Sequence, residues 1–176
     1  MPQQLPLVIV PATNLRQPSR LIQTDEFADS NFIKLVADMM HTMHTDDGIG
    51  LAAPQIGHNI RLITIGADAF SGSAALPFST DADLALINPE IETYSWKTAV
   101  DEEGCLSVPG YAGSVERHVT ISVKAPTRDG AAITFTAPDY FARVLQHEID
   151  HLNGVLYIDR AKEVWKLDRV SSSRHL

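Results

Sequence analysis

Hydrophobic residues recur at helical spacing in two stretches of the chain. Residues 26–44 place Phe, Ile, Leu, Val and Met side chains every three or four positions between polar residues, which predicts an amphipathic helix. A second helix is predicted from Pro138 to about Leu152, because proline is tolerated in a first helical turn and the following Asn153-Gly154 ends a helix well. The methionines of the first helix are expected to fill the core.

Strand patterns occupy much of the remaining chain. Residues 119–123 alternate apolar and polar side chains, and residues 131–136 repeat the alternation after a Thr-Arg-Asp-Gly turn, which predicts an antiparallel hairpin. Short apolar runs predict further strands at 7–10, 60–65, 84–88, 91–94 and 155–158, and a short terminal helix is predicted at 161–168. The expected fold class is α+β, with mostly antiparallel strands packed around a central helix.

One stretch fits neither pattern. The run Gly48-Ile49-Gly50-Leu51-Ala52-Ala53-Pro54-Gln55 contains too many small residues to pack as an ordinary helix or strand. Small residues allow the backbone to approach another group closely. We therefore expect this run to lie against a functional site.

Composition indicates one globular domain over residues 1–176, with a frayed tail at about 169–176. The net charge of -8 and the lack of a dense basic cluster argue against DNA or an anionic membrane as a partner. The start of the chain lacks a signal-peptide pattern, and a single cysteine excludes an internal disulfide. We expect a cytoplasmic protein, with a monomer favoured.

The predicted second helix carries the most informative motif, Gln146-His147-Glu148-Ile149-Asp150-His151. Two histidines four residues apart project from one helix face, which suits two ligands on one divalent metal. The adjacent Glu148 can then move the protons of a water molecule activated by that metal. This motif also arises by chance, so further site residues elsewhere in the chain are needed to support a metal site.

A hydrolytic metal site typically uses three protein ligands. Cys105, in Glu103-Gly104-Cys105-Leu106-Ser107, is the best candidate for the third, because a thiolate binds Zn(II) or Fe(II) strongly. Glu163 lies too close to the motif for a thermolysin-like arrangement, and the third histidine of the longer metzincin motif is absent. The sequence therefore disfavours the ordinary metalloprotease interpretations.

With Cys105 as third ligand, the chain resembles the peptide deformylase family. The run at 48–55, the segment at 103–107 and the segment at 146–151 match the family's three motifs in order. The resemblance extends from roughly the first helix to Arg160. It implies removal of the formyl group from the N-terminal formylmethionine of newly made polypeptides, with release of formate. The expected partners are therefore N-formylmethionyl nascent peptides, met in the cytoplasm or at the ribosome, and no membrane partner is expected.

The resemblance also implies roles for individual residues. Cys105, His147 and His151 correspond to the metal ligands, Glu148 to the general acid and base, and the Gln55 side chain with the Leu106 backbone N–H to the oxyanion donors. It suggests Fe(II) as the cellular metal, and the ligand set also accepts Zn(II), Ni(II) or Co(II). Candidate substrate-pocket residues are Ile49, Gly50, Gly110, Tyr111, Tyr140 and Val144.

Supporting residues and competing functions complete the sequence-based expectations. Glu103 and Asp150 are candidates to orient ligand imidazoles, and Arg143 is either a rim charge or a partner for Glu103. An arginine that contacts substrate in some family members is replaced by Ala112. The alternatives are a metal amidase acting on another small N-acyl substrate, and an idle binding protein, which the complete set of site residues disfavours.

Overall fold

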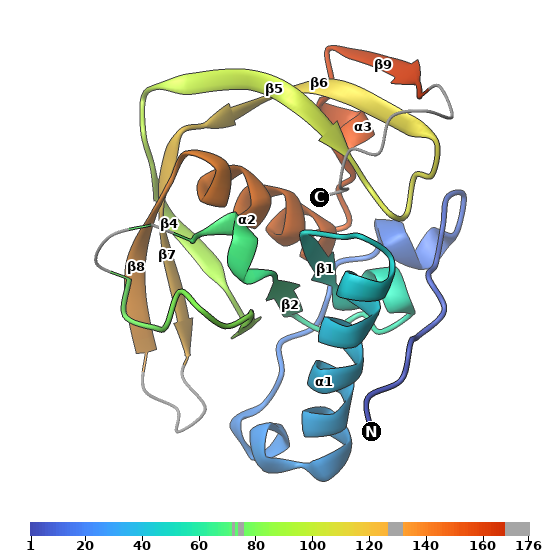
Figure 1. The fold of residues 1–176 in the computed structure, drawn as a ribbon, viewed down its shortest axis with the longest axis vertical. Helices are drawn as coiled ribbons and strands as arrows, with labels where there is room; N and C mark the ends of the chain where they lie inside the picture. The colour runs from blue at the N-terminus through green and yellow to red at the C-terminus, as the bar shows by residue number, and fades with distance from the viewer. Residues whose placement is uncertain (72, 74–75, 127–131, 168–176) are drawn as a thin grey trace.

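The computed structural model has an α+β fold and describes residues 1–71, 73, 76–126 and 132–167. Figure 1 shows one helix, α2 (Asp139–Leu152), in the middle of the molecule. Strands lie on its left and above it, and α1 (Ser30–Thr45) lies below. None of the helices in this described part combines the length and apolar character needed to cross a membrane.

The strands form three antiparallel sheets of three strands each in the described residues. The sheet beside α1 has the order β1-β2-β3, the sheet on the left of Figure 1 has the order β4-β7-β8, and the upper sheet has the order β5-β6-β9. Their bounds are β1 Gly50–Ala52, β2 Leu62–Ile65, β3 Leu84–Ile87, β4 Glu90–Tyr94, β5 Thr98–Gly104, β6 Tyr111–His118, β7 Thr120–Pro126, β8 Ala132–Pro138 and β9 Glu163–Lys166.

The predicted hairpin is confirmed, since β7 and β8 pair in antiparallel register from Thr120–Pro138 to Pro126–Ala132. Its predicted turn falls at 127–131, outside the described residues. The predicted strand at 91–94 exists as β4, but it pairs with β7 and does not continue the β2–β3 sheet. The sequence pattern gave no information on this choice of partner, because pairing across sheets is a long-range property.

The first predicted helix is broken at Asp29. Residues Thr24–Ala28 form a separate 3-10 turn, η2, and α1 begins at Ser30. The Asp29 carboxylate accepts hydrogen bonds from the Asn31 and Phe32 amides, which makes it the N-cap. Met39 and Met43 are fully buried, as the spacing predicted.

The other short segments are 3-10 turns or a single helical turn. They are η1 (Thr13–Arg16), η3 (Ala53–Ile56), η4 (Ala67–Ala69) and α3 (Tyr157–Arg160). The small-residue run therefore forms β1 followed by η3, and the expectation that it would not form a strand is wrong for Gly50–Ala52. The predicted strand at 7–10 is also wrong, because that segment is extended but pairs with no strand.

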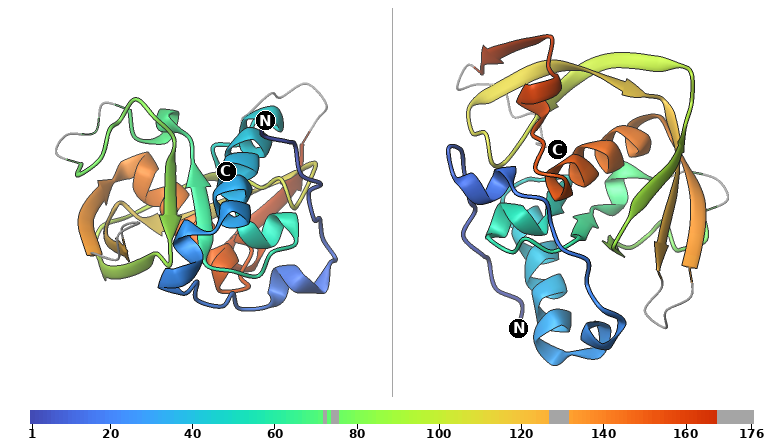
Figure 2. Two further views of the ribbon diagram at one scale, coloured as in Figure 1. Left: turned by 90° about the horizontal axis from the view of Figure 1, so that it is seen from below. Right: turned by 180° about the vertical axis from the view of Figure 1, so that it is seen from behind.

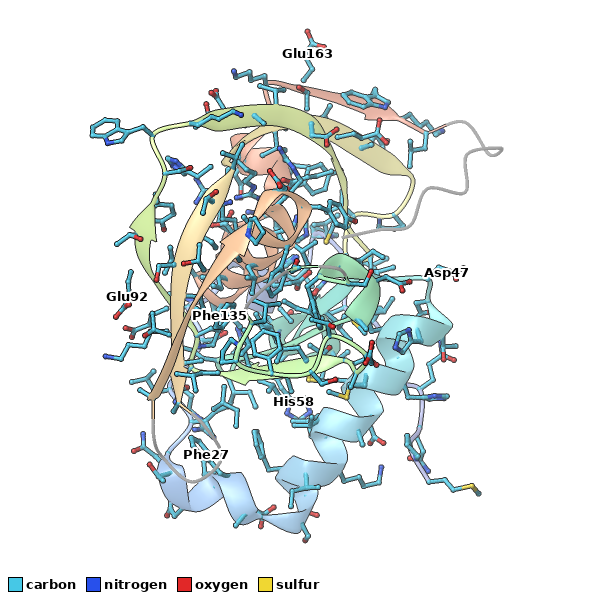
Figure 3. The ribbon with its side chains drawn as sticks, turned by 60° about the vertical axis from the view of Figure 1, so that its left-hand side comes forward. Phe27, Asp47, His58, Glu92, Phe135 and Glu163 are labelled. Carbon is cyan, nitrogen blue, oxygen red and sulfur yellow. The ribbon has the colours of Figure 1, made fainter. Side chains whose placement is uncertain are left out.

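The predictions for the C-terminal part are reversed by the structure. Residues predicted as a strand at 155–158 include the start of α3, and the predicted terminal helix is instead β9. Backbone pairing with β6, from Tyr111–Lys166 to Ser114–Glu163, holds β9 in place. Figure 3 shows Glu163 on this outer strand pointing away from the molecule. The predicted frayed tail lies outside the described residues.

The core surrounds α2, and Phe141 lies at its aromatic centre. Phe141 is 1% exposed, and its ring centroid lies 5.0 Å from that of Phe70 and 5.9 Å from that of Phe135. Phe135 points inward from β8 (Figure 3). Together with residues of β2 and β7 these rings form one continuous apolar cluster against α2. This packing fixes the helix that carries His147, Glu148 and His151.

Replacing Phe141 should test how strongly this packing holds the fold. Phe141→Ala removes a buried ring and leaves a cavity, so it should lower the free energy of unfolding by about 3–5 kcal/mol. Val164→Ala, at an exposed position on β9, is the control and should change it by about 0.5 kcal/mol or less. Urea unfolding of both variants measures the difference, and equal effects would contradict the central role of Phe141.

Candidate metal centre

Three potential metal ligands meet in the interior, where the end of β5 reaches α2. Cys105 follows β5 directly, and His147 and His151 lie one helical turn apart on α2. Their ligand atoms all lie within 4.8 Å of one another, and all three residues are buried. The Cys105 Sγ lies 3.3 Å from the His151 Nε2, which lies 3.3 Å from the His147 Nε2. The structure therefore brings together the three residues predicted to hold a metal.

The electrostatics of these residues fit a bound cation. Burial lowers the pKa of His151 well below its ordinary value, so this imidazole is in the neutral form that ligates metals. Burial also disfavours charge on His147, but its interactions with Cys105 and Glu103 outweigh burial and raise its pKa to about 10. The centre thus attracts positive charge, and its nitrogen and sulfur donors suit a divalent transition metal.

Glu148 lies beside this centre without a hydrogen bond. It is fully buried, and among the described residues neither carboxylate oxygen has a hydrogen-bond partner. Burial is the main cause that raises the pKa of the Glu148 carboxyl to about 7. A carboxylate with both oxygens available and a pKa near neutrality can accept and return a proton.

Gly50 on β1 packs directly against Glu148. A Cβ atom added at Gly50 would lie 2.3 Å from Glu148 Oε1, so the Glu148 side chain would have to move to admit it. A Cβ at Gly48 would lie 3.0 Å from Leu106 Cδ1. The expectation that small residues let this run approach another group closely is therefore confirmed, since Gly50 packs against Glu148 and Gly48 against Leu106.

Of the two predicted oxyanion donors, the Gln55 side chain lies against the centre. The Gln55 side chain is fully buried, its Oε1 accepts a hydrogen bond from the Ala52 amide at 2.8 Å, and its Nε2 lies 3.5 Å from Cys105 Sγ. Because Ala52 occupies Oε1, the amide group of Gln55 is directed toward the metal ligands. The Leu106 N–H, next to Cys105, has no hydrogen-bond partner among the described residues.

A buried carboxylate, Glu103, connects the ligands to the surrounding strands. Its Oε2 accepts a hydrogen bond from His147 Nδ1 at 2.9 Å, which directs His147 Nε2 toward the centre. Arg117 donates to both Glu103 oxygens at 2.9 Å, and Arg143 Nη1 donates to Oε1 at 2.7 Å. Burial opposes ionisation of Glu103, but the hydrogen bonds from Arg117 and His147 hold its pKa well below its ordinary value.

Arg143 and Asp150 are both buried parts of this network. Of the two alternatives for Arg143, the structure shows the partner of Glu103, and this side chain also donates to the carbonyls of Ala99 and Val115. Asp150 was expected to orient a ligand imidazole, but among the described residues its carboxylate accepts hydrogen bonds from arginines instead, from Arg117 at 2.5 Å and from Arg160 at 2.5 and 2.7 Å. It supports the network from the far side of Arg117.

Two residues of the site were missed by the sequence analysis. Sequence analysis assigned no role to Arg117. It lies two residues after Val115 on β6, and strand alternation buries both side chains. Tyr157 stacks on His147, with ring centroids 6.1 Å apart and planes 20° apart. No local signal marks Tyr157, because the contact depends on the position of α3 relative to α2.

The predicted substrate-pocket residues are not gathered in one apolar cavity. Ile49 and Val144 belong to the core, whereas Gly110, Tyr111 and Tyr140 are exposed. Tyr140 lines a cavity of about 170 Å³ at the start of α2. The other lining residues of this cavity are mostly polar: Ala99, Asp101, Arg117, His118, Val119, Asp139 and Arg143.

Replacing Glu103 should show how much the hydrogen-bond network around the ligands contributes to metal affinity and to stability. Glu103→Gln keeps the size of the side chain but removes the charge that compensates two buried arginines, so metal affinity should fall about 10- to 100-fold. Stability should fall by about 3–5 kcal/mol. Metal competition with a chelator and urea unfolding measure these effects. Glu102→Gln, at the exposed neighbouring position, is the control and should change neither quantity.

Comparisons with known proteins agree with this arrangement. The family model described as polypeptide deformylase matches residues 4–166. The chain is 45% identical to a peptide deformylase of Agrobacterium fabrum (strain C58), over 88% of this chain and 85% of that protein. It is 43% identical to a peptide deformylase of Mesorhizobium japonicum, over 90% of this chain and 85% of that protein.

Solved structures show the same fold. A class I type b peptide deformylase from Acinetobacter baumannii with bound Met-Ala-Ser superimposes with a TM-score of 0.79 at 33% identity, covering 91% of this chain and 99% of that one. The peptide deformylase from Thermotoga maritima gives a TM-score of 0.79 at 36% identity, covering 92% and 99%. The chain therefore belongs to the polypeptide deformylase family.

Proposed function

We propose that the buried centre formed by Cys105, His147 and His151 carries out the reaction of this family, the metal-dependent removal of the formyl group from N-formylmethionine of newly made polypeptides. The observation that carries this assignment is the convergence of three ligand atoms within 4.8 Å beside a Glu148 carboxylate with no hydrogen-bond partner among the described residues. A structural metal site has no need for such a carboxylate. A hydrolytic site requires one to move protons.

The three ligands would hold one divalent metal ion. Such an ion polarises a carbonyl oxygen and lowers the pKa of a water molecule when bound. We propose Fe(II) in the cell, with Zn(II), Ni(II) or Co(II) as substitutes, because a Cys/His/His set accepts all four. The Glu103 carboxylate keeps the His147 ring oriented through its Nδ1.

Glu148 is proposed as the general base and then the general acid. Its carboxylate takes a proton from the attacking water and returns it to the nitrogen of the leaving peptide. Burial against Gly50 raises the pKa of Glu148 to about 7, which suits a group that must both accept and release a proton near neutral pH.

Gln55 and Leu106 are proposed to stabilise the negative charge that develops on the formyl oxygen. The Ala52 amide holds the Gln55 side chain so that Gln55 Nε2 faces Cys105. The N–H of Leu106, the residue after Cys105, has no hydrogen-bond partner among the described residues and can donate to the substrate. Donors fixed before the reaction stabilise the transition state more than the substrate, each by about 2.7–4 kcal/mol.

Selectivity for the formyl group follows from the close passage of β1 next to Glu148. The space that even a Cβ at Gly50 would need is already filled by the Glu148 carboxylate. An acyl group larger than formyl would compete for the same space. We propose Ile49, Gly50, Gly110, Tyr111, Tyr140 and Val144 as substrate-contacting residues, of which Tyr140 lines the polar cavity at the start of α2.

The domain organisation, oligomeric state, substrate and location of the protein are also proposals. We propose that residues 1–176 act as one domain and one monomer on N-formylmethionyl nascent chains, in the cytoplasm and near the ribosome where such chains emerge. Support comes from the match of the family model over residues 4–166 and from the apolar clusters that join the sheets to α2.

Replacing the proposed proton carrier should abolish turnover without loss of the metal. Glu148→Gln keeps the size of the side chain but cannot accept a proton, so kcat should fall by about 100-fold or more. Metal content should remain one ion per chain, because Glu148 is not a proposed ligand. Steady-state kinetics and metal analysis measure both quantities. Full activity in Glu148→Gln would refute the assigned role.

Replacing an oxyanion donor should affect turnover more than binding. Gln55→Ala should lower kcat by about a hundred- to thousandfold, because it removes one fixed donor. The variant should still bind its metal and substrate. Loss of the metal in this variant would count against the proposed role, since it would make Gln55 part of the ligand support.

The choice of acyl group distinguishes a deformylase from another small-acyl amidase. Otherwise identical N-formyl-Met and N-acetyl-Met peptides should differ in kcat/KM by about 100-fold or more, because the added methyl group has no room beside Glu148. Comparable rates on the two peptides would favour the amidase.

A further inference from the structure

The two proposed oxyanion donors lie on separate parts of the chain. Gln55 is on η3 and Leu106 is in the connection between β5 and β6. Within the described residues, the hydrogen bond that joins these parts directly is the 3.5 Å contact between Gln55 Nε2 and Cys105 Sγ. Oxyanion donors act only when both stand about 2.7–3.1 Å from the developing charge. Leu106 also shares an apolar cluster with Ala53 and Ile56 of η3, but apolar packing is non-directional and leaves the orientation of the two donors to other contacts.

The N-terminal strap, residues 8–19, bridges the two parts through backbone hydrogen bonds. The Val8 amide donates to the carbonyl of Gln55 at 2.7 Å, and the Val10 amide donates to the carbonyl of Ser107 at 2.9 Å. Val8 and Val10 are two residues apart, and Val10 begins a turn. Their two hydrogen bonds thus tie the Gln55–Ile56 peptide to the Ser107–Val108 peptide, which lies next to Leu106 in the chain.

Further contacts hold the strap itself in place. The Asn14 Nδ2 donates to the Pro54 carbonyl at 3.0 Å, and the Ser19 amide donates to the carbonyl of Leu152, the last residue of α2, at 2.8 Å. The right panel of Figure 2 shows the strap passing from beside α1 to the end of α2. The strap therefore contacts the chain at or beside each of the three motifs.

The side chains of the strap reinforce this bridge. Val10 packs against the apolar cluster that contains Cys105, Val108 and Tyr157. Ile9, between the two bonded valines, is 48% exposed, and its amide donates no hydrogen bond within the described residues. The amides of Val8 and Val10 donate hydrogen bonds and the amide of Ile9 between them does not. The effect of losing each N–H can therefore be compared within three consecutive residues.

We propose that Val8 and Val10 are positioning residues for catalysis, which hold Gln55 and Leu106 at the spacing that the oxyanion requires. The inference rests on the proposed function, because it takes these two groups as the donors. A displacement of about 1 Å at a reacting group can cost about 100-fold in rate. Loss of either strap hydrogen bond should therefore lower turnover although neither valine touches the substrate.

Replacing single amides by esters in the full-length chain tests the proposal. An ester at Val8 or at Val10 removes one N–H and keeps the side chain, and an ester at Ile9 is the matched control. Each protein is loaded with the same metal and assayed on a formyl-Met peptide. The Val8 and Val10 esters should lose at least tenfold in kcat, with KM within about twofold and one metal ion per chain. The Ile9 ester should match the unmodified chain.

A spectroscopic measurement separates positioning from a loss of stability and from a failure of the proposed function. The NMR signals of the Gln55 side-chain amide and the Leu106 backbone amide should shift in the Val8 and Val10 esters and not in the Ile9 ester. Equal kcat in all three esters, or signals that stay unchanged, would overturn the proposal. If the unmodified chain had no deformylase activity, the proposed function would be refuted. The Gln55 and Leu106 amide signals would still show whether the strap hydrogen bonds position these two groups.

Discussion

The carboxylate of Glu103 is the interaction on which the arrangement of the site depends. It accepts hydrogen bonds from His147 on α2, from Arg117 on β6 and from Arg143 on α2, and it lies on β5 two residues before Cys105. A buried carboxylate is costly unless its charge is compensated, and removing one partner leaves the others uncompensated. The strand that leads to Cys105 and the helix that carries the imidazoles are therefore held together by one charge.

A second constraint is steric. β1 passes so close to Glu148 that a side chain at Gly50 would displace the Glu148 carboxylate, and this contact helps to bury the carboxylate and limits the space beside it. Burial is also the main cause that raises the pKa of Glu148. The same close approach thus accounts for the acid–base property of Glu148 and for the proposed preference for the smallest acyl group.

The regions that differ from the sequence-based predictions show where local patterns lose their value. The terminal segment has helical composition, yet it forms β9 because the open edge of β6 provides backbone partners for Glu163–Lys166. Asp29 looked like a polar residue within a helix, but its carboxylate caps the following helix and separates η2 from α1. In both cases a backbone hydrogen-bonding requirement overrides the apolar periodicity.

The sequence by itself determined the α+β class, the two principal helices, the β7–β8 hairpin and the ligand candidates, because helical spacing and strand alternation are local. His147 and His151 share a helix face whatever surrounds them. Only the tertiary structure decided that Cys105 meets them, that Arg117 and Tyr157 support His147, and that the N-terminal strap joins Gln55 to the Leu106 segment. These contacts link residues far apart in the chain, and their formation depends on sheet register and on the compensation of buried charge.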